Sequence, residues 1–208
     1  MAERYLKTQW HLILASQSPR RKELLENLGI RFSCVTPNIL EARQAKESPA
    51  KYVKRNSFEK AYKVLQTHHE KNTIILSADT VVVINKKVLE KPNDTKDAQE
   101  MLQLLSGKTH QVLTGVTILS YRKAIDCHQF VTSTSVTFRK LLSSEIKKYV
   151  KTKEPMDKAG AYAAQGKGAF MVESVNGSYT NVIGLPMSEV SKILIKDFKL
   201  EIFPKNKL

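Results

Sequence analysis

The sequence predicts an α/β fold in which a mixed, strongly twisted sheet is flanked by helices. Short apolar segments of strand length alternate with amphipathic helices early in the chain, as in folds that build layers of helices on a sheet. Long β-branched segments follow one another later, which favours antiparallel pairing in the same sheet. A chain of 208 residues with 41% hydrophobic residues can bury one sizeable core, so we expect a single domain over residues 1–208, with its core at about 11–200.

The first predicted strand and helix follow each other closely. Residues 12–16 are short and apolar, which predicts a buried strand. A helix is predicted over 19–28, because Ser18 is a suitable N-cap and Pro19 suits the first helical position, where its missing N–H costs nothing. Gly29 then suits the position just after the helix.

The next elements continue the alternation. Residues 32–36 predict a second strand, and 49–66 predict a helix whose apolar residues recur at helical spacing. The stretch TIILSADTVVVI is a β-branched strand segment broken by Asp79, and a turn at 85–87 leads to a short return strand. The remaining predicted elements are helices at 95–106, 144–150 and 187–198 and strands at 110–121, 127–140 and 169–175.

The formal net charge of +14 favours polyanionic partners, namely nucleic acid, an acidic membrane surface or phosphorylated small molecules. The basic residues are scattered without an arginine-rich arm, so charge alone does not choose among these. No run of 18 apolar residues indicates a membrane span, and the first residues lack a secretory signal. Two isolated cysteines are typical of a reduced, cytoplasmic protein.

Two arginines occupy the first turn of the helix at 19–28, where the helix dipole disfavours positive charge. Arg20 and Arg21 each cost about 0.3–1 kcal/mol at this position. A strand, a short loop and a helix N-terminus together form a geometry that binds phosphate through backbone N–H groups, and the hydroxyls of Ser16 and Ser18 add donors. We therefore expect a phosphate chain to compensate the arginines. The Gly-rich patterns of dinucleotide folds and P-loop ATPases do not occur.

Asp79 is the most prominent acidic residue, because it stands alone in an apolar segment. At the end of a core strand it would point into a cleft, where it could serve hydrolysis of a phosphoanhydride together with a divalent metal. A turn or edge position is the alternative. Glu41, Lys60 and Lys91 are weaker candidates, since each taken singly suits a solvated surface. No Ser/His/Asp or Cys/His set suggests covalent catalysis.

The motifs, taken in series, resemble those of one family over about residues 11–200. They are LILASQSPRRKELL, the Glu41 region, FEKA, SADTVV, LEKP, LSGKTHQVLTGV, EPMDKAGAYAAQG and NGSYTNVIGLP. This order and spacing is similar to that of the Maf-like (septum formation inhibitor Maf) nucleotide pyrophosphatases. The resemblance implies an α/β fold with a deep cleft, similar to inosine triphosphate pyrophosphatases, and frequent dimers, so a homodimer is one expected state.

The resemblance also implies an activity and residue roles. Maf-like enzymes are cytoplasmic, depend on a divalent metal (Mg, Mn or Co) and cleave a nucleoside triphosphate into the monophosphate and pyrophosphate. By this resemblance Asp79 is the catalytic acid–base, and Glu41 and Asp79 hold the metal. The residues implied to bind the triphosphate are Ser16, Ser18, Arg20, Arg21, Lys60 and Lys91.

Substrate choice within the family is implied by three positions. Arg20, Thr80 and Gln165 match the branch that acts on dTTP and UTP, whereas the branch acting on 7-methyl-GTP carries Glu in place of Gln165. A Gln amide offers both a donor and an acceptor to a pyrimidine edge. Ala163 and Ala164 depart from the usual family pattern beside this position. We therefore expect hydrolysis of dTTP and UTP, with modified pyrimidine triphosphates as a further substrate class.

A different function class stays open at this point. A basic protein without catalysis could regulate cell division by binding nucleic acid or protein, as the family name suggests. No recognition helix or aromatic stacking motif supports this alternative, and Asp79 would have no purpose in a phosphate-binding groove. Nucleic acid is accordingly not an expected partner.

Overall fold

The computed structural model describes residues 10–204, and seven strands within them form one mixed sheet. Its order is β2-β1-β3-β5-β6-β7, with β4 paired to β3. β1, β2 and β3 run parallel, whereas β5, β6, β7 and the short β4 join by antiparallel pairing. The predicted α/β class is confirmed. The strands are β1 (His11–Ala15), β2 (Phe32–Val35), β3 (Thr73–Ile84), β4 (Lys87–Leu89), β5 (Thr109–Tyr121), β6 (Ile125–Phe138) and β7 (Val172–Asn176).

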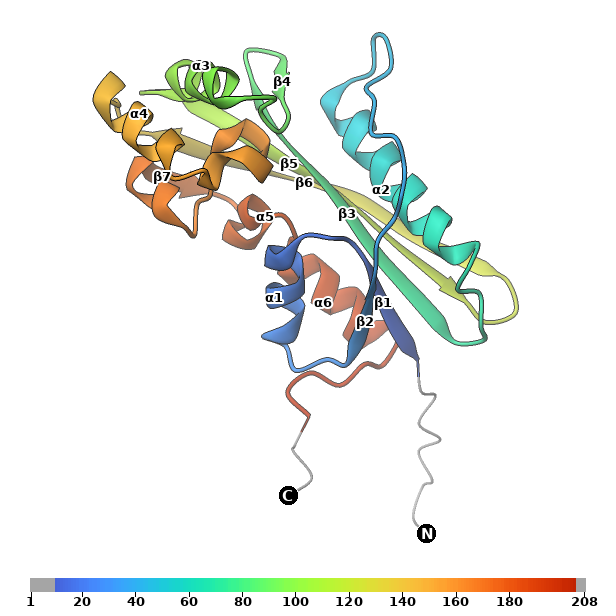
Figure 1. Ribbon diagram of the computed structural model, residues 1–208. Helices are drawn as coiled ribbons and strands as arrows, with labels where there is room; N and C mark the ends of the chain where they lie inside the picture. Colours follow the sequence, from blue (N-terminus) through green and yellow to red (C-terminus); the bar gives the residue numbers. More distant parts are fainter. Residues whose placement is uncertain (1–9, 205–208) are drawn as a thin grey trace.

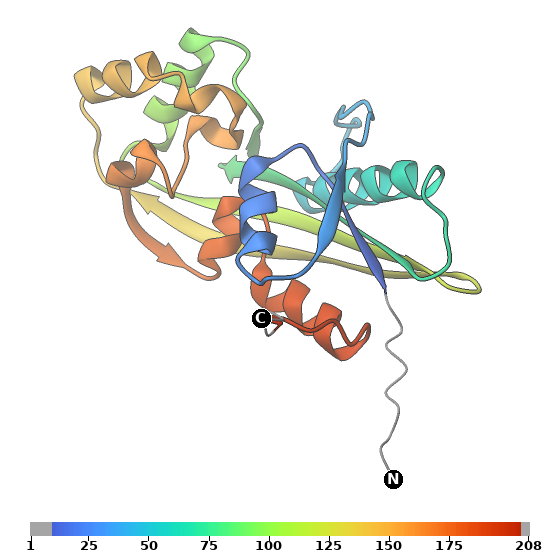
Figure 2. The same cartoon turned by 60° about the horizontal axis from the view of Figure 1, so that its bottom comes forward.

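Helices cover both faces of the sheet. α2 lies along one face, and α1 and α6 lie against the other, as Figure 1 and the turned view in Figure 2 show. α3 and α4 pack together toward one end of the sheet. The helices are α1 (Pro19–Glu26), α2 (Pro49–Leu65), α3 (Thr95–Leu105), α4 (Ser143–Lys151), α5 (Tyr179–Ile183) and α6 (Met187–Lys196), with 3-10 segments η1 (Glu154–Asp157), η2 (Ala159–Ala161) and η3 (Lys167–Met171). No helix among the described residues is both long and apolar enough to span a membrane.

Alternation along β3 distributes its side chains between the two helical layers. Ile75 packs against α2, whereas Ile74 and Leu76 pack against the layer of α1 and α6. Because β3 lies in the middle of the sheet, both of its faces are buried. This two-sided burial accounts for the nearly continuous apolar composition of the segment.

The sheet is interrupted along one edge of β3. β1 pairs with β3 only up to Leu76, and β4 pairs with it only from Val82. Within the described residues, the intervening segment 77–81 is therefore paired only with β5. β1 and β3 separate after Leu76, which leaves an opening in the sheet beside Asp79. Asp79 itself lies in the middle of β3.

Two predictions about local structure need correction. Asp79 neither breaks nor ends a strand, because β3 continues through it from Thr73 to Ile84, and its carboxylate is satisfied by partners on α2. The strand predicted at 169–175 begins only at Val172, since residues 167–171 form the 3-10 segment η3. The other predicted helices and strands are confirmed with boundaries shifted by at most three residues.

Candidate active site

An open cleft of about 630 Å³ lies at the interruption of the sheet. Its walls come from the β1–α1 loop, the middle of β3, the loop before α2, and the segment from η1 to α5. All ten residues that the sequence singled out line this one cleft. They are Ser16, Ser18, Arg20, Arg21, Glu41, Lys60, Asp79, Thr80, Lys91 and Gln165.

Asp79 is buried on the face of β3 that packs against α2. Both of its carboxylate oxygens accept hydrogen bonds from that helix: Nζ of Lys60 is 2.6 Å from Oδ1, and Nδ2 of Asn56 is 3.0 Å from Oδ2. Asn56 and Lys60 are four residues apart, so they lie one above the other on the same face of α2. The two donors fix the orientation of the carboxylate at the cleft.

Lys60 connects Asp79 to a second carboxylate. Its Nζ is also 2.9 Å from Oε2 of Glu41, in the loop before α2. The Lys60 side chain is only 8% exposed, so its charge is nearly removed from water and depends on these partners. Asp79, Lys60 and Glu41 thus form one ionic network that faces the cleft. Among the described residues, no group of three or more His, Cys, Asp or Glu side chains is arranged to hold a metal ion.

The loop that carries Glu41 is fastened to α2 by Arg55. The guanidinium donates to the carbonyl oxygen of Ala42 (Nη2–O 2.9 Å) and to both carboxylate oxygens of Glu47 (2.8 and 2.9 Å). The hydrogen bonds from Arg55 lower the pKa of Glu47 to about 2. Arg55 therefore positions Glu41 from outside the cleft, a role the sequence analysis did not anticipate.

Arg21 is held by acceptors within the protein. Its guanidinium donates to the carbonyl oxygen of Gly184 (2.8 Å), to Oγ1 of Thr80 (3.0 Å) and to Oγ of Ser16 (3.3 Å). Burial lowers the pKa of Arg21, although a guanidinium remains charged at any physiological pH. Three uncharged oxygens of the protein thus accept hydrogen bonds from Arg21, and binding of a phosphate chain at this helix start stays a prediction. Ser18 is the N-cap of α1, as predicted.

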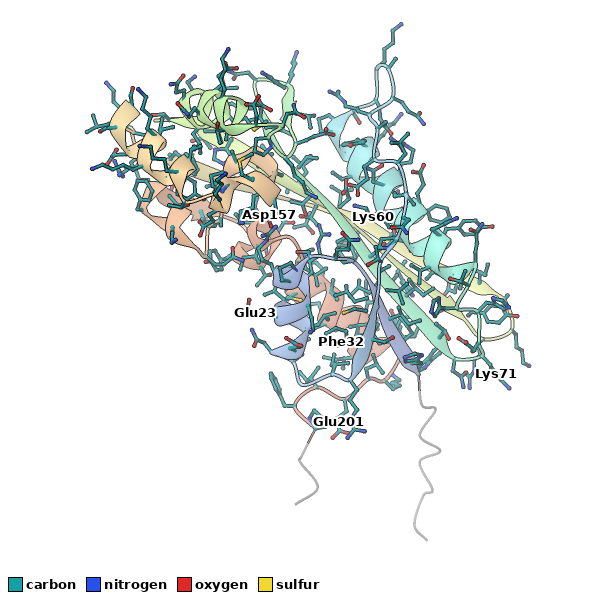
Figure 3. The ribbon with its side chains drawn as sticks, in the orientation of Figure 1. Glu23, Phe32, Lys60, Lys71, Asp157 and Glu201 are labelled. Carbon is teal, nitrogen blue, oxygen red and sulfur yellow. The ribbon has the colours of Figure 1, made fainter. Side chains whose placement is uncertain are left out.

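Arg20 reaches across the cleft instead. Its Nη1 is 3.1 Å from Oδ2 of Asp157, at the end of η1 on the opposite wall. Partial burial raises the pKa of Asp157, but hydrogen bonds from Lys158 and Arg20 outweigh this effect and the pKa is lowered. Figure 3 labels Asp157 near the 3-10 segments and Lys60 beside α2, on the two sides of the cleft.

The remaining predicted residues lie on the wall with less extensive contacts. Lys91 and Gln165 are exposed, and Thr80 turns its hydroxyl toward Arg21 and Thr114. Ala163 and Ala164 line the cleft next to Gln165. Asn56 and Asp157 were not predicted as site residues. Asn56 could have been found from its spacing, four residues before Lys60 on one helix face.

The side chains that line the cleft carry both signs of charge. Five are cationic, namely Arg20, Arg21, Lys60, Lys91 and Lys158, and four are carboxylates, namely Glu41, Asp79, Glu90 and Asp157. A polyanion would find guanidinium and ammonium donors here beside a carboxylate that could accept a proton from water. This combination suits hydrolysis of a phosphoanhydride.

The solved structures that are similar to this chain include two proteins of low sequence identity. A HAM1 protein from Coxiella burnetii is 17% identical, with a TM-score of 0.46, over 90% of this chain and 100% of that chain. A nucleoside-triphosphatase / dITP/XTP pyrophosphatase from Mycobacterium abscessus is 12% identical, with a TM-score of 0.40, over 63% of this chain and 75% of that chain.

Comparison with known sequences returns much closer relatives. A dTTP/UTP pyrophosphatase from Bacillus cytotoxicus is 47% identical, covering 88% of this chain and 93% of the relative. Proteins of the same name from Escherichia coli (strain K12) and Clostridioides difficile (strain 630) are 47% and 43% identical, covering 88% and 93% of this chain and 91% and 98% of the relatives. The family model described as Maf-like protein matches residues 11–197. The chain belongs to the family of Maf-like proteins.

Proposed function

We propose that this protein is a nucleoside triphosphate pyrophosphatase that hydrolyses dTTP and UTP to the monophosphate and pyrophosphate. The observation that carries the proposal is the position of Asp79, a buried carboxylate on the wall of the same cleft as Arg20, Arg21, Lys60 and Lys91. The relatives named dTTP/UTP pyrophosphatase, at 43–47% identity over most of the chain, support the same reaction.

In this reaction a water oxygen attacks the α-phosphorus, the bond from that phosphorus to the bridging oxygen breaks, and pyrophosphate leaves. Asp79 is suited to take the proton from the water, because Lys60 and Asn56 orient its carboxylate toward the cleft. We propose that Ser16, Ser18 and the cationic side chains bind the phosphate chain. Their positive charge would stabilise the negative charge that develops on the leaving pyrophosphate.

A divalent cation (Mg, Mn or Co) belongs to this proposal, and the donors present fit it. Asp79 and Glu41 offer two carboxylates around a single position, and a cation such as Mg²⁺ usually takes one or two carboxylates and completes its coordination with phosphate oxygens and water. When bound there, the cation would neutralise phosphate charge and polarise the phosphoryl group.

Selection of the base is proposed to depend on Gln165, with Thr80 and Arg20. Gln165 is exposed on the cleft wall, where its amide can both donate to and accept from a uracil or thymine edge. Thr80 would act through Arg21, to which its hydroxyl is bonded. A pocket that admits the methyl group of thymine also suits other 5-substituted pyrimidines. A cytoplasmic location, a homodimer and a single domain stay predictions.

The proposal is tested by assaying the purified full-length chain against a panel of nucleoside triphosphates, with Mg²⁺, Mn²⁺ and Co²⁺ supplied in turn. Pyrophosphate and orthophosphate are measured separately. We expect pyrophosphate with dTTP and UTP at a kcat/KM well above that for GTP and ATP. Release of orthophosphate alone, or equal rates with all bases, would reject the proposal.

A further inference from the structure

The ammonium group of Lys60 lies between the two carboxylates that the proposed function assigns to a divalent cation. Its nitrogen is 2.6 Å from Oδ1 of Asp79 and 2.9 Å from Oε2 of Glu41. The Lys60 side chain is 8% exposed, so this position is a buried one. A positive charge of the chain itself therefore already lies between the two carboxylates.

A second cation would enter an environment that is already rich in positive charge. Arg21 is half-buried on the wall of the cleft, and Arg20 and Lys91 line the same cleft. Like charges a few ångströms apart repel strongly where water is scarce. A divalent cation could bind both carboxylates only if Lys60 withdrew, and withdrawal alone would leave a buried ammonium without its partners.

A nucleotide changes this balance because its phosphate chain adds several negative charges. Phosphate oxygens offer the Lys60 ammonium new acceptors, and its flexible four-carbon stem permits a move of this kind while Asn56 continues to hold Asp79. The same oxygens supply further ligands for a divalent cation.

We propose that Lys60 competes with the divalent cation for Asp79 and Glu41, so that the cation binds together with the nucleotide and not before it. This inference rests on the proposed function, since it takes the metal and the phosphate chain from there. It assigns Lys60 a role in the free protein, that of a resident cation which keeps the carboxylate pair in place and excludes a metal until the substrate arrives.

The test measures binding of Mn²⁺ to the full-length chain without nucleotide, by the loss of the electron paramagnetic resonance signal of free Mn²⁺. We expect Lys60→Met to bind Mn²⁺ at least tenfold more tightly than the wild type. The matched control is Lys63→Met, an exposed lysine one turn away on α2, which should behave as the wild type. Adding Glu41→Gln to Lys60→Met should remove the gain, because one carboxylate is lost.

Two further measurements guard against a fold defect in Lys60→Met. Lys60→Gln keeps a hydrogen-bond donor near Asp79 and should also bind Mn²⁺ more tightly, with far-ultraviolet circular dichroism verifying that each variant is folded. The complex of the wild type with a non-hydrolysable dTTP analogue should bind Mn²⁺ at least tenfold more tightly than the protein alone or the analogue alone.

Equal Mn²⁺ affinity of the wild type and the folded Lys60 variants would overturn the competition, as would a wild type that binds Mn²⁺ equally well with and without the analogue. None of these readouts requires turnover. Failure of the protein to hydrolyse dTTP would therefore reject the proposed function separately, while the Mn²⁺ titrations of the free protein would still decide the competition.

Discussion

Asp79 and Gly115 lie directly opposite each other on the antiparallel strands β3 and β5. The absence of a side chain at Gly115 allows the backbone of α2 to approach the sheet closely. A Cβ added there would overlap the carbonyl group of Val53 and lie 2.8 Å from the amide nitrogen of Lys54. Because Asn56 and Lys60 follow on the same helix, this close approach brings their side chains to Asp79.

The first prediction concerns Gly115→Ala. The added methyl group must displace α2, so we expect the free energy of unfolding to fall by about 1–3 kcal/mol, as for an overpacked core. The displaced helix would also lose the contacts of Lys60 and Asn56 with Asp79, so kcat should fall along with stability. Urea unfolding and steady-state kinetics measure the two effects, and a variant as stable and active as the wild type would contradict the close contact.

The second prediction concerns Asp79→Asn. An amide cannot take a proton from water, so we expect kcat for dTTP to fall by roughly 10²–10⁴-fold, the range associated with loss of a general base. Affinity for a non-hydrolysable dTTP analogue, measured by calorimetry without a divalent cation, should remain close to that of the wild type. Asp126→Asn, at an exposed aspartate on β6, is the control and should retain full activity. Turnover by Asp79→Asn within tenfold of the wild type would remove Asp79 from its proposed role.

The sequence predicted the layers of this fold because helices with one apolar face and buried strands each have a characteristic spacing of apolar residues. It could not predict that β3 continues through Asp79. A carboxylate in an apolar segment suggests a break when only the chain itself is considered, whereas α2 supplies Lys60 and Asn56 as partners for that carboxylate. Contacts between segments far apart in sequence decide such cases.

The same reasoning explains what was missed at the site. The apolar stripe of α2 runs through Val53 and Ala61. Lys60, for which a lone lysine predicts a solvated surface, is instead buried, because it pairs with Asp79 and Glu41. Asp157 gave no signal, since its partner Arg20 is 137 residues away in the chain. The prediction that ten residues would serve one site depended on the family resemblance, which carries spatial information that propensities lack.

The third prediction concerns pH and the buried His110, whose Nε2 is 2.8 Å from the hydroxyl oxygen of Tyr162 on the cleft wall. Burial lowers the pKa of His110 to about 4 from its ordinary 6.5. The neutral ring is thus favoured in the folded state, so its contribution to stability is complete above pH 6.5 and is lost as the pH falls toward 4. The loss should reach about 3 kcal/mol.

His110→Gln, which is neutral at every pH, provides the comparison for this effect. The difference between the free energies of unfolding of the wild type and of the variant should be constant from pH 8 to 7 and should shrink by about 3 kcal/mol between pH 6.5 and 4. Urea unfolding at each pH measures this difference. The titration of carboxylates elsewhere in the chain affects both proteins equally and therefore cancels. A difference that does not vary with pH would mean that the ring is not desolvated in the folded protein.

The last prediction concerns Gln165→Glu. Gln165 is exposed on the cleft wall, where the proposed function gives its amide the task of donating to a carbonyl oxygen of uracil or thymine. A glutamate can only accept, and it would place a negative charge against that oxygen. Loss of one such hydrogen bond with an unpaired acceptor costs about 1–3 kcal/mol, so kcat/KM for dTTP and UTP should fall by roughly 10–100-fold.

Gln103→Glu supplies the matched control, because Gln103 is exposed on α3 and makes the same change of charge away from the cleft. It should leave kcat/KM unaltered. A further comparison separates base recognition from electrostatic repulsion of the phosphates: repulsion would weaken inhibition by pyrophosphate in Gln165→Glu, whereas lost recognition of the base would not. Unchanged inhibition by pyrophosphate together with a selective loss for dTTP and UTP would assign Gln165 to the base, and an equal loss for every nucleotide would assign it to the phosphate chain.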